Sequence, residues 1–332
     1  MTSSDSSVGP VVGESPPATV AAVRHRPSLD VVIVNWNTGR FLERCLRSIT
    51  ATDHAALTLD AVVVVDNAST DDSLAAAEAA PAVTVLRNAH NRGFAAACNQ
   101  GARVGRADWI LFLNPDTELG PDTLTRVFDC IGNSAEHRVG VYGAQMVNSA
   151  GDRESSCSRF PTLFLFLAEM TGLSRVAPRV FPRRHLAPAE TAAGGIVDQV
   201  IGSFFVVSRF LFEHLDGFDE RFFVYFEDVD FAYRARAVGK VCYVCADALV
   251  YHEGGVSSNR VPALRLYYSL RSRTQFARKH WPRWQSATLV ALTVGIEIPI
   301  RIGMSALRRG LRETARGALL YIRYIVSPSF VA

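Results

Sequence analysis

Runs of apolar residues alternate with helix-like segments along the first third of the chain. Four apolar runs end in polar residues, in "LDVVIVNWN", "LDAVVVVDNAST", "VTVLRN" and "WILFLNPD". The segments between them favour helices, by apolar spacing in "FLERCLRSITA" and by alanine content in "DDSLAAAEAA", where Asp71 or Asp72 is placed to cap the helix. Strands that are apolar on both faces and alternate with helices are typical of a parallel sheet covered by helices. Residues 28–120 therefore predict a doubly wound α/β half.

The second half of the chain is less regular. Its prolines and the stretch "AAGG" predict loops around a short helix over residues 150–200. Further on we expect a strand in "VIGSFFVVSR", a helix and loop in "FLFEHLDGFDERFF", a helix in "EDVDFAYRARAVG" and a strand pair in "KVCYVCADALVYH". Residues 262–332 favour helices, with a break at Trp281-Pro282.

The polar ends of the four early strands predict a binding cleft. They are Asn35–Asn37, Asp66–Thr70, Asn88–Gly93 and Asn114–Asp116. In an open α/β sheet, ligands bind beyond the carboxyl ends of the strands. The first strand is not followed by G-x-G-x-x-G, and the chain has no G-x-x-x-x-G-K-[ST], which excludes the usual dinucleotide and P-loop sites.

The aspartates at these strand ends each have two possible roles. Asp66 closes a run of four valines, and it either caps the next helix or accepts hydrogen bonds from a nucleobase or ribose hydroxyl. Asp116 belongs to Asn-Pro-Asp, which is turn chemistry, but it also stands where a buried strand opens onto the surface.

A second group of carboxyls stands among aromatic residues in "FVYFEDVDFAYR". Glu227, Asp228 and Asp230 suit a helix N-terminus, where acids favour the helix dipole. The surrounding apolar surface also favours a carboxyl with restricted hydration and a raised pKa, which could serve as a general base. His252 follows the strand "ALVYH"; a lone histidine is more often structural than a ligand.

The charge of the chain is unevenly distributed. The net charge of the whole chain is only +3. After Ser257, however, the chain has thirteen basic residues and only two acidic ones, Glu297 and Glu313, which gives that part a charge near +11 and leaves about −8 for the rest. Such asymmetry suggests a surface that meets phosphates of nucleic acid or of anionic lipid. Because the chain has no helix-turn-helix, zinc or RNP motif, nucleic acid is disfavoured.

The C-terminal region therefore has two interpretations, and neither is a membrane span. Its uninterrupted apolar stretch, Ala287–Ile296, is about half of the roughly 20 residues that a span needs. The helices either pack on the catalytic part with a solvated basic face, or form an interfacial pair on anionic lipid, which we favour.

The remaining composition favours a cytoplasmic protein. The six cysteines of a chain of 332 residues do not form a disulfide framework, and Cys242 and Cys245 lack a second pair for zinc, so buried strand thiols are expected. Residues 1–27 are rich in Ser, Pro and Gly without the pattern of a signal peptide, and predict a disordered tail.

Several ordered motifs resemble the family 2 glycosyltransferases, and most of all their bacterial rhamnosyltransferase-like members. The resemblance covers about residues 29–280. It depends on "VVIVNWN", "VVVVDNASTDDS", "NRGFAAACNQG", "ILFLNPDTEL", "GSFFVVSR" and "GFDERFFVYFEDVDFAYRARAVG", followed by His252. It implies the nucleotide-sugar-binding GT-A fold: an α/β domain over residues 28–255 with a mostly parallel central sheet flanked by helices, plus a basic helical segment over residues 256–332.

The resemblance also implies roles for single residues. Asp228 matches the catalytic base, Asp116 the last position of the Asp-x-Asp metal motif, and His252 a histidine that joins the metal shell in some relatives. Asn114 stands where the first Asp of that motif is usual, which removes a negative charge from the metal site. The residues expected at the nucleotide-sugar are Asn35, Asn37, Asp66, Asn67, Arg92, Asn99 and Asn114, and those on the acceptor side are Gly202, Ser203 and Glu227.

The activity implied by the resemblance is inverting sugar transfer assisted by Mg²⁺ or Mn²⁺. We expect L-rhamnose from dTDP-rhamnose to be moved to a hydroxyl of a polyprenyl-diphosphate-linked or polysaccharide acceptor, by a cytoplasmic enzyme peripheral on the inner face of the cell membrane. The alternatives are a UDP-sugar donor, or a sugar-binding or scaffold relative without turnover.

Overall fold

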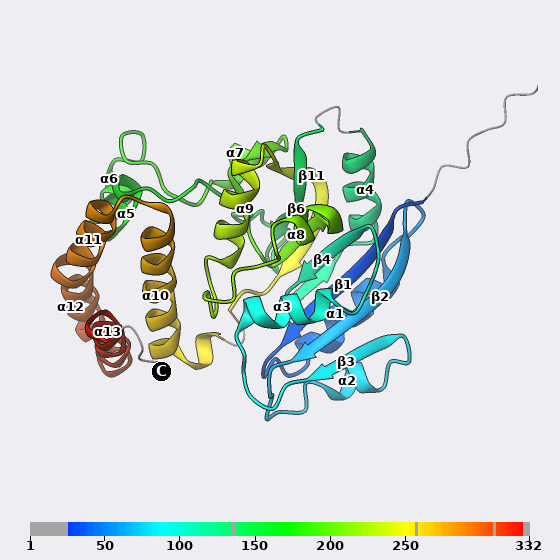
Figure 1. Cartoon of the computed structure of the whole chain (residues 1–332), viewed down its shortest axis with the longest axis horizontal. Helices are drawn as coiled ribbons and strands as arrows, with labels where there is room; N and C mark the ends of the chain where they lie inside the picture. The colour runs from blue at the N-terminus through cyan, green and yellow to red at the C-terminus, as the bar shows by residue number, and fades with distance from the viewer. Residues whose placement is uncertain (1–25, 134–136, 256–257, 308–309, 328–332) are drawn as a thin grey trace, which may run out of the picture.

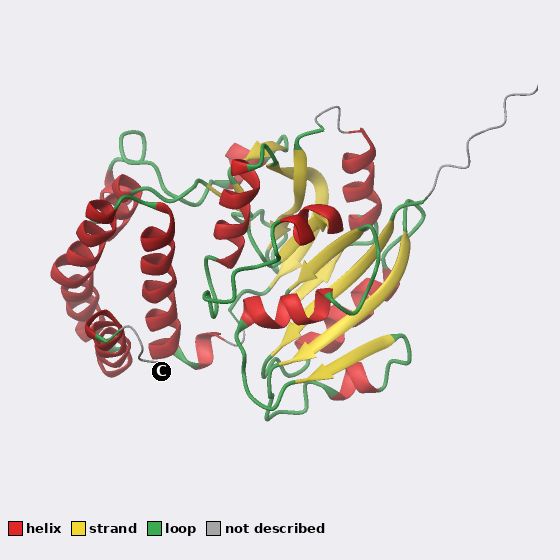
Figure 2. Cartoon of the chain, in the orientation of Figure 1, coloured by secondary structure: helices red, strands yellow, loops and turns green. Residues whose placement is uncertain are grey.

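A mixed sheet forms the centre of the molecule (Figures 1 and 2). The computed structural model describes residues 26–133, 137–255, 258–307 and 310–327, so the expected N-terminal tail lies almost wholly outside the described residues. The strand order is β3-β2-β1-β4-β10-β6-β11-β5, and β8 also pairs with β11. The strands are β1 Ser28–Asn35, β2 Thr58–Asp66, β3 Val83–Arg87, β4 Trp109–Leu113, β5 Thr117–Leu119, β6 Val139–Val147, β8 Gly195–Val197, β10 Phe204–Ser208 and β11 Val241–His252. A separate small sheet pairs β7 Cys157–Ser158 with β9 Gln199–Val200.

The register of the parallel strands brings their polar ends to one edge. Asn35 of β1 pairs with Asp66 of β2, and Asp66 pairs with Arg87 of β3. The last residue of β4, Leu113, lies opposite Ile33, two residues before the end of β1. The predicted clustering of the strand ends is therefore confirmed.

Helices cover both faces of the sheet because its strands are apolar on both sides. Helices α1 Phe41–Ala51 and α4 Thr123–Asn133 pack on the face that carries Ile33 and Val64. Helices α3 Phe94–Ala102, α8 Arg209–His214 and α9 Glu227–Ala237 pack on the face that carries Val32 and Val65. Alternate residues of one strand thus enter two different cores.

The C-terminal helices form an arm beside the sheet, at the left in Figure 1. The arm, as we use the term, consists of α10 Pro262–His280, α11 Arg283–Leu292, a π-helical turn at Thr293–Glu297, α12 Ile298–Leu307 and α13 Leu311–Val326. A 3-10 turn at Ser258–Arg260 precedes it, and the segments α5 Leu163–Met170, α6 Leu173–Val176 and α7 Pro188–Thr191 connect the small sheet to β8. The predicted break at Trp281-Pro282 is confirmed between α10 and α11.

A buried ion pair stabilises the inside of the arm. Arg273 of α10 donates from its guanidinium to Glu297 at 2.5 Å and to Thr293 at 2.8 Å, and Arg301 reaches the other Glu297 oxygen at 2.9 Å. Burial alone would raise the pKa of Glu297, but the two arginines lower it. The acidic residue that interrupts the apolar sequence is thus paired inside the protein.

Two expectations about local structure are wrong, and one strand was not predicted. The alanine-rich helix is only one turn, α2 Ala75–Glu78, because the Asp71 carboxylate bonds the backbone N–H groups of Ser73 and Gly39 and holds the preceding residues in a loop. The expected strand pair at 240–252 is the single strand β11, which has a register shift between Cys245 and Leu249. Strand β6, with its internal glycines, was not foreseen, although it lies between β10 and β11.

Candidate active site

We name the edge of the sheet formed by the ends of β1 and β2 the donor edge, after the donor site that the sequence predicts there. A polar network lies on it. The Asn35 amide donates to Asp66 Oδ1 and to Ser73 Oγ, both at 2.9 Å. Ser69 donates to both Asp66 oxygens, from its hydroxyl at 2.6 Å and its backbone N–H at 3.1 Å. Asn37 has a positive φ of 52°, and its side-chain oxygen accepts from Thr70 N at 2.7 Å. Asn35, Asn37 and Asp66 are therefore brought together, as the sequence predicts.

A pocket of about 410 Å³ opens beside this network. Its lining combines carboxylates, hydroxyls and one cation: Asp66, Ala68, Ser69, Asp71, Asp72, Leu74, Ala75, Glu78, Arg87 and Asn88. The volume lies within the range of small-molecule sites, roughly 300–1,000 Å³. Acceptor oxygens at the floor of such a pocket suit the N–H and O–H donors of a base or a ribose.

Asp116 and His252 face each other at the mouth of the turn after β4. The Asp116 carboxylate lies 3.5 Å from His252 Nε2, without the geometry of a hydrogen bond. Both side chains are largely buried, and His252 Nε2 has no hydrogen-bond partner among the described residues. Asp116 lies in the turn between β4 and β5, and His252 is the last residue of β11, which pairs with β5 directly after that turn. The expected pair of metal ligands is thus adjacent in space.

Asp228 lies at the start of α9 and is held by a turn between β9 and β10. Its Oδ2 accepts from Gly202 N at 2.9 Å and from the Gln199 amide at 2.8 Å, and its Oδ1 accepts from Val229 N at 2.8 Å. Burial raises the pKa of Asp228, against the lowering effect of these backbone bonds and of Arg184. A half-buried carboxylate with a raised pKa has the properties of a general base.

The same turn connects Asp228 to the Asn114–Asp116 turn. Ser203, next to Gly202, accepts at its backbone oxygen from Asn114 N at 3.0 Å. Asn114 begins the turn that carries Asp116. The Asp228 carboxylate and the turn that carries Asp116, which are 112 positions apart in the sequence, therefore both bond the backbone at Gly202 and Ser203.

Glu227 is the more deeply buried neighbour of Asp228. Its side chain is 5% exposed, and its Oε2 has no hydrogen-bond partner among the described residues. Burial, and then the charge of Asp228, raise the pKa of Glu227 well above its ordinary value. Adjacent helical residues point in different directions, so the two carboxyls do not share one role.

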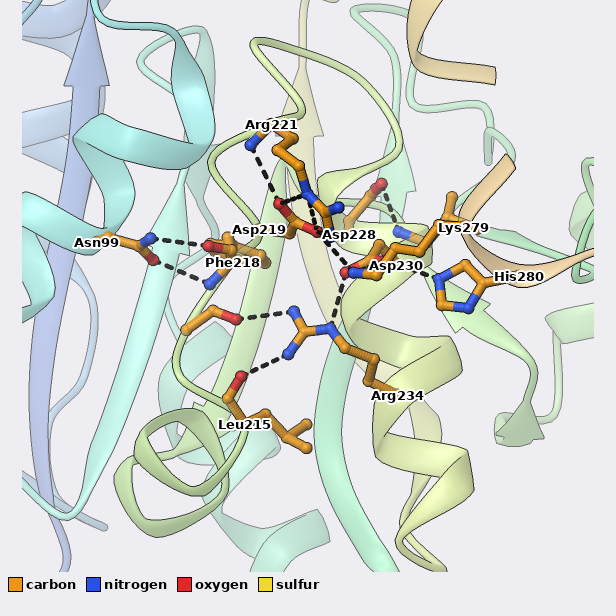
Figure 3. A network of polar contacts seen from close by, with 12 residues as sticks. Asn99, Leu215, Phe218, Asp219, Arg221, Asp228, Asp230, Arg234, Lys279 and His280 are labelled. Carbon is orange, nitrogen blue, oxygen red and sulfur yellow. Dashed lines mark hydrogen bonds and ion pairs between the residues drawn. The ribbon is translucent and has the colours of Figure 1, made fainter. Parts of the chain in front are cut away.

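Asp230, two residues further, belongs to a different network (Figure 3). It is bonded by three basic side chains: Arg234 at 2.7 Å, His280 at 2.7 Å and Lys279 at 2.6 Å. Lys279 also reaches Asp219 at 2.6 Å. Burial alone would raise the pKa of Asp230, but His280, Arg234 and Lys279 lower it. The C-terminal end of α10 is thereby tied to α9 close to Asp228.

Two of the residues expected at the nucleotide-sugar, Asn99 and Asn67, hold loops in place. The amide of Asn99 is engaged at both ends by the backbone of Phe218, at 2.8 and 2.9 Å, which favours a positioning role over the expected sugar contact (Figure 3). Asn67 is buried and donates to Gly93 O at 3.1 Å. Arg92 lies half-exposed, with its guanidinium 3.4 Å from the Gln100 side chain and 4.0 Å from Glu220.

Close contacts require a glycine at position 93 and fix the orientation of Ser203. Gly93 has a φ of 88°, and a Cβ there would meet Phe223 O at 2.5 Å, so only glycine allows the "NRGF" loop to approach the loop before α9. The Ser203 hydroxyl is buried and donates to Met146 Sδ at 3.5 Å, so that its backbone, and not its side chain, faces the turn that carries Asp116.

Sequence reasoning missed three residues at the site. Arg260 donates to Asn37 O at 2.9 Å and lies 3.8 Å from Asp71, although 223 positions separate it from Asn37. Gln199 bonds Asp228, and Arg184 is a cation that acts on the charge of Asp228. Arg184 also lies over the Phe226 ring at 5.6 Å. No local pattern marks these residues, because their positions depend on long-range packing.

A match to a protein family shows which class of enzyme this chain is. Residues 30–177 match the family described as Glycosyl transferase family 2. The chain carries a family 2 glycosyltransferase domain. It is a glycosyltransferase, as the resemblance implies, and the match covers the donor edge as far as α6.

The relatives of this glycosyltransferase include named rhamnosyltransferases. It is 29% identical over 282 residues to N-acetylglucosaminyl-diphospho-decaprenol L-rhamnosyltransferase of Mycobacterium tuberculosis, which covers 79% of this chain and 87% of the relative. It is 27% identical over 179 residues to rhamnosyltransferase WbbL of Escherichia coli, which covers 49% of this chain and 60% of that relative.

The fold is that of GT-A-like glycosyltransferases. A mannosyltransferase of Pyrobaculum calidifontis, solved in complex with GDP-Man and Mn²⁺, superposes with a TM-score of 0.53 at 18% identity, over 92% of this chain and 89% of that one. The expected fold class, a mostly parallel sheet flanked by helices with C-terminal helices, is confirmed.

Proposed function

We propose that this glycosyltransferase moves L-rhamnose from dTDP-rhamnose to a hydroxyl of a lipid-linked cell-envelope glycan, with inversion at the anomeric carbon. The relative from M. tuberculosis, whose name contains both the sugar and a diphospho-decaprenol acceptor, supports the sugar and the kind of acceptor. A UDP-sugar donor is the alternative within the same fold.

One observation carries the proposal. The Asn114–Asp116 turn and the Asp228 carboxylate both bond the backbone of the turn at residues 201–203. A donor whose nucleotide lies in the pocket beside Asp66 would extend its diphosphate towards Asp116 and its sugar towards Asp228. An acceptor hydroxyl on the far side of that sugar would then meet the base.

The residues at the diphosphate end fit a divalent cation. Asp116 and His252 come within 3.5 Å of each other, and His252 Nε2 is a buried nitrogen without a hydrogen-bond partner among the described residues. Mg²⁺ or Mn²⁺ needs few protein ligands when substrate phosphates and water complete its shell. Asp116 and His252 would hold the ion, which offsets the negative charge that grows on the leaving diphosphate.

Asp228 would take the proton of the attacking hydroxyl. A carboxylate offers about four lone-pair positions, so the bonds from Gly202, Gln199 and Val229 leave room for one more donor. These three bonds fix the orientation of the carboxylate before the acceptor arrives. Because burial raises its pKa, the Asp228 carboxylate is a stronger base than an exposed aspartate.

The arm would bring the enzyme to an anionic membrane. One side of α13 carries an exposed apolar stripe, Leu311, Leu319, Ile322 and Val326, beside an arginine stripe, Arg312, Arg316 and Arg323. An apolar stripe flanked by arginines is typical of interfacial helices. Among the described helices, residues 283–307 are long and apolar enough to cross a membrane, but length and composition alone are weak evidence, and this segment holds the paired Glu297.

The test measures donor binding and metal dependence together. A thermal-shift panel of dTDP- and UDP-sugars with Mg²⁺ or Mn²⁺ names the donor. Release of nucleoside diphosphate, with a polyprenyl-diphosphate glycan as acceptor, then measures turnover. We expect EDTA to abolish turnover and Asp116→Ala to lower it by about a hundredfold or more, since a metal ion supplies several kcal/mol of charge stabilisation.

The matched control for Asp116→Ala is Asp122→Ala, at an exposed aspartate on the loop after β5. Full activity of the wild type in EDTA, or equal activity of the two variants, would remove the metal from the proposal. Donor binding without any transfer would favour a sugar-binding relative.

A further inference from the structure

Exposed large hydrophobic side chains are concentrated in two segments of this glycosyltransferase. Of the eighteen in the described part of the chain, nine lie between Trp284 and Val326 in the arm. Four more lie far away in the sequence, between α5 and α7: Phe164, Leu173, Val176 and Val180. We name residues 163–184 the α5–α6 hairpin. Nothing in the donor or acceptor chemistry described above uses its exposed residues.

The hairpin is closed at its base and open at its tip. The Phe164 ring stacks on the Phe181 ring at 5.6 Å, and the Arg184 N–H donates to Glu169 Oε1 at 3.0 Å. Between these contacts, Val176 is 84% exposed and Val180 is 66% exposed. The tip is held by its own backbone bonds, so its valines are presented to the surroundings by an ordered turn.

The charge of the hairpin tip has one sign. Arg175, Arg179 and Arg183 stand next to or near the exposed valines, and the sequence has no acidic residue between Thr171 and Ala187. Arginine side chains beside exposed aliphatic ones favour an interface in which the apolar groups enter and the guanidinium groups meet phosphates. A second copy of this chain is a poor partner for the tip, because equal patches would bring six arginines together.

The hairpin also lies at the end of the molecule that the arm forms. Phe166 and Met170 of α5 pack with Leu289 of α11 and Phe276 of α10 in one buried cluster. Figure 1 accordingly shows α5 and α6 next to α11, at the end formed by the arm. At the other end of the hairpin, Arg184 lies over Phe226, the residue before α9, and its charge acts on Asp228. The hairpin thus connects the apolar end of the molecule to the acceptor side of the site.

We propose that the tip of the α5–α6 hairpin, Leu173–Arg183, is a second docking element for an anionic lipid bilayer. It inserts Val176 and Val180 between the headgroups, while its arginines bind lipid phosphates. With the arm it would fix the acceptor side of the site against the surface that carries the acceptor. The purpose of this docking rests on the proposed lipid-linked acceptor, whereas the vesicle-binding experiment that tests the docking does not depend on any acceptor.

The test is co-sedimentation of the full chain with vesicles. We expect binding to vesicles of phosphatidylcholine with about a third phosphatidylglycerol, and weak binding to phosphatidylcholine alone or at 1 M salt. The double variant Val176→Asp/Val180→Asp should bind the anionic vesicles about ten- to a hundredfold more weakly, since two aliphatic side chains no longer enter the interface. The double variant Arg175→Gln/Arg179→Gln should also bind several-fold more weakly.

The controls use exposed residues of the same types elsewhere. They are Val104→Asp/Val238→Asp, at valines that are 41% and 46% exposed, and Arg47→Gln on α1. Equal vesicle binding by the hairpin and control variants would overturn the proposal. So would a wild type that ignores vesicles but forms a dimer that Val176→Asp/Val180→Asp dissociates. Because no sugar is present in this assay, its failure is separate from a failure of glycosyl transfer.

Discussion

Helix α9 presents two carboxylates to opposite surroundings. Asp228 faces the turn at residues 201–203, where its hydrogen bonds come from uncharged groups, and its pKa is raised. Asp230, on the other side of the helix, is bonded by Arg234, Lys279 and His280, and its pKa is lowered. Burial acts in the same direction on both. The difference lies in the basic partners, two of which, Lys279 and His280, come from the arm.

The first turn of α9 therefore carries two carboxylates, Asp228 and Asp230, that are suited to different tasks. A base must release its proton to be ready and must then hold a new one, which favours a pKa raised towards the working pH. A structural carboxylate must remain charged, which favours several cationic partners. Placing the two carboxylates on opposite sides of α9 keeps Lys279 and Arg234, which bond Asp230, away from Asp228, the proposed base.

The largest effect is expected from removing the base. Asp228→Asn keeps the shape of the side chain but cannot take a proton, so kcat should fall by about 10²–10⁴. Donor binding in the thermal-shift panel should stay unchanged. In the wild type, kcat/KM should decrease as the pH falls through the raised pKa of Asp228, because protonation removes the base; the residual activity of the variant should lack this acid limb.

The control for this variant is Asp247→Asn, at an exposed carboxylate of β11. Near-normal turnover of Asp228→Asn would remove Asp228 from the role of base. An acid limb that persists in the variant would assign the titration to another group.

The donor edge could be predicted from the sequence because local rules determine it. Each polar cluster follows an apolar strand directly, and parallel register then brings Asn35 and Asp66 together. The start of α9 was equally visible, as a group of acids before a helical pattern. The resemblance named Asp228, but the lowered pKa of Asp230 two positions later has no signal in the local sequence.

The rest of the site depends on contacts between distant residues. Arg260 reaches Asn37 across 223 positions, and Lys279 meets Asp219 across 60. The basic C-terminal region was assigned to a phosphate surface as a whole, whereas Arg260 and Lys279 have specific partners inside the molecule. The short helix α2 shows that a local pattern can also predict the wrong structure. Its alanine content favours a longer helix, but the Asp71 carboxylate stabilises a loop in the residues before it.

An intermediate effect is expected from cutting the tie between the arm and α9. Lys279→Met keeps the apolar stem but leaves Asp219 and Asp230 with one cation fewer. The free energy of unfolding should fall by about 1–3 kcal/mol, the range for a hydrogen bond to a charged group. The chain has one other lysine, Lys240, which bonds a backbone oxygen at the surface, so Lys240→Met is the matched control.

Urea unfolding of the two lysine variants would measure this difference. The acid limb of kcat/KM should be the same in Lys279→Met as in the wild type, because the described contacts of Lys279 reach Asp219 and Asp230 and not Asp228. A shifted limb would show that the arm also tunes the base, and the separation of the two sides of α9 would be wrong.

The smallest effect has the opposite sign and concerns Glu227. Its carboxyl is buried, one oxygen lacks a hydrogen-bond partner among the described residues, and its pKa is raised first by burial and then by Asp228. A carboxyl with a raised pKa in the folded state contributes stability that is present below its unfolded pKa and is lost as the pH rises through the folded pKa.

Glu227→Gln, which stays neutral, should therefore unfold at a higher Tm than the wild type at neutral pH. The gain should shrink as the pH falls into the range in which the Glu227 carboxyl of the wild type is protonated. The exposed Glu213→Gln is the control. A variant that is less stable than the wild type at neutral pH would mean that Glu227 is ionised and paired, and that the two sides of α9 differ less than their contacts indicate.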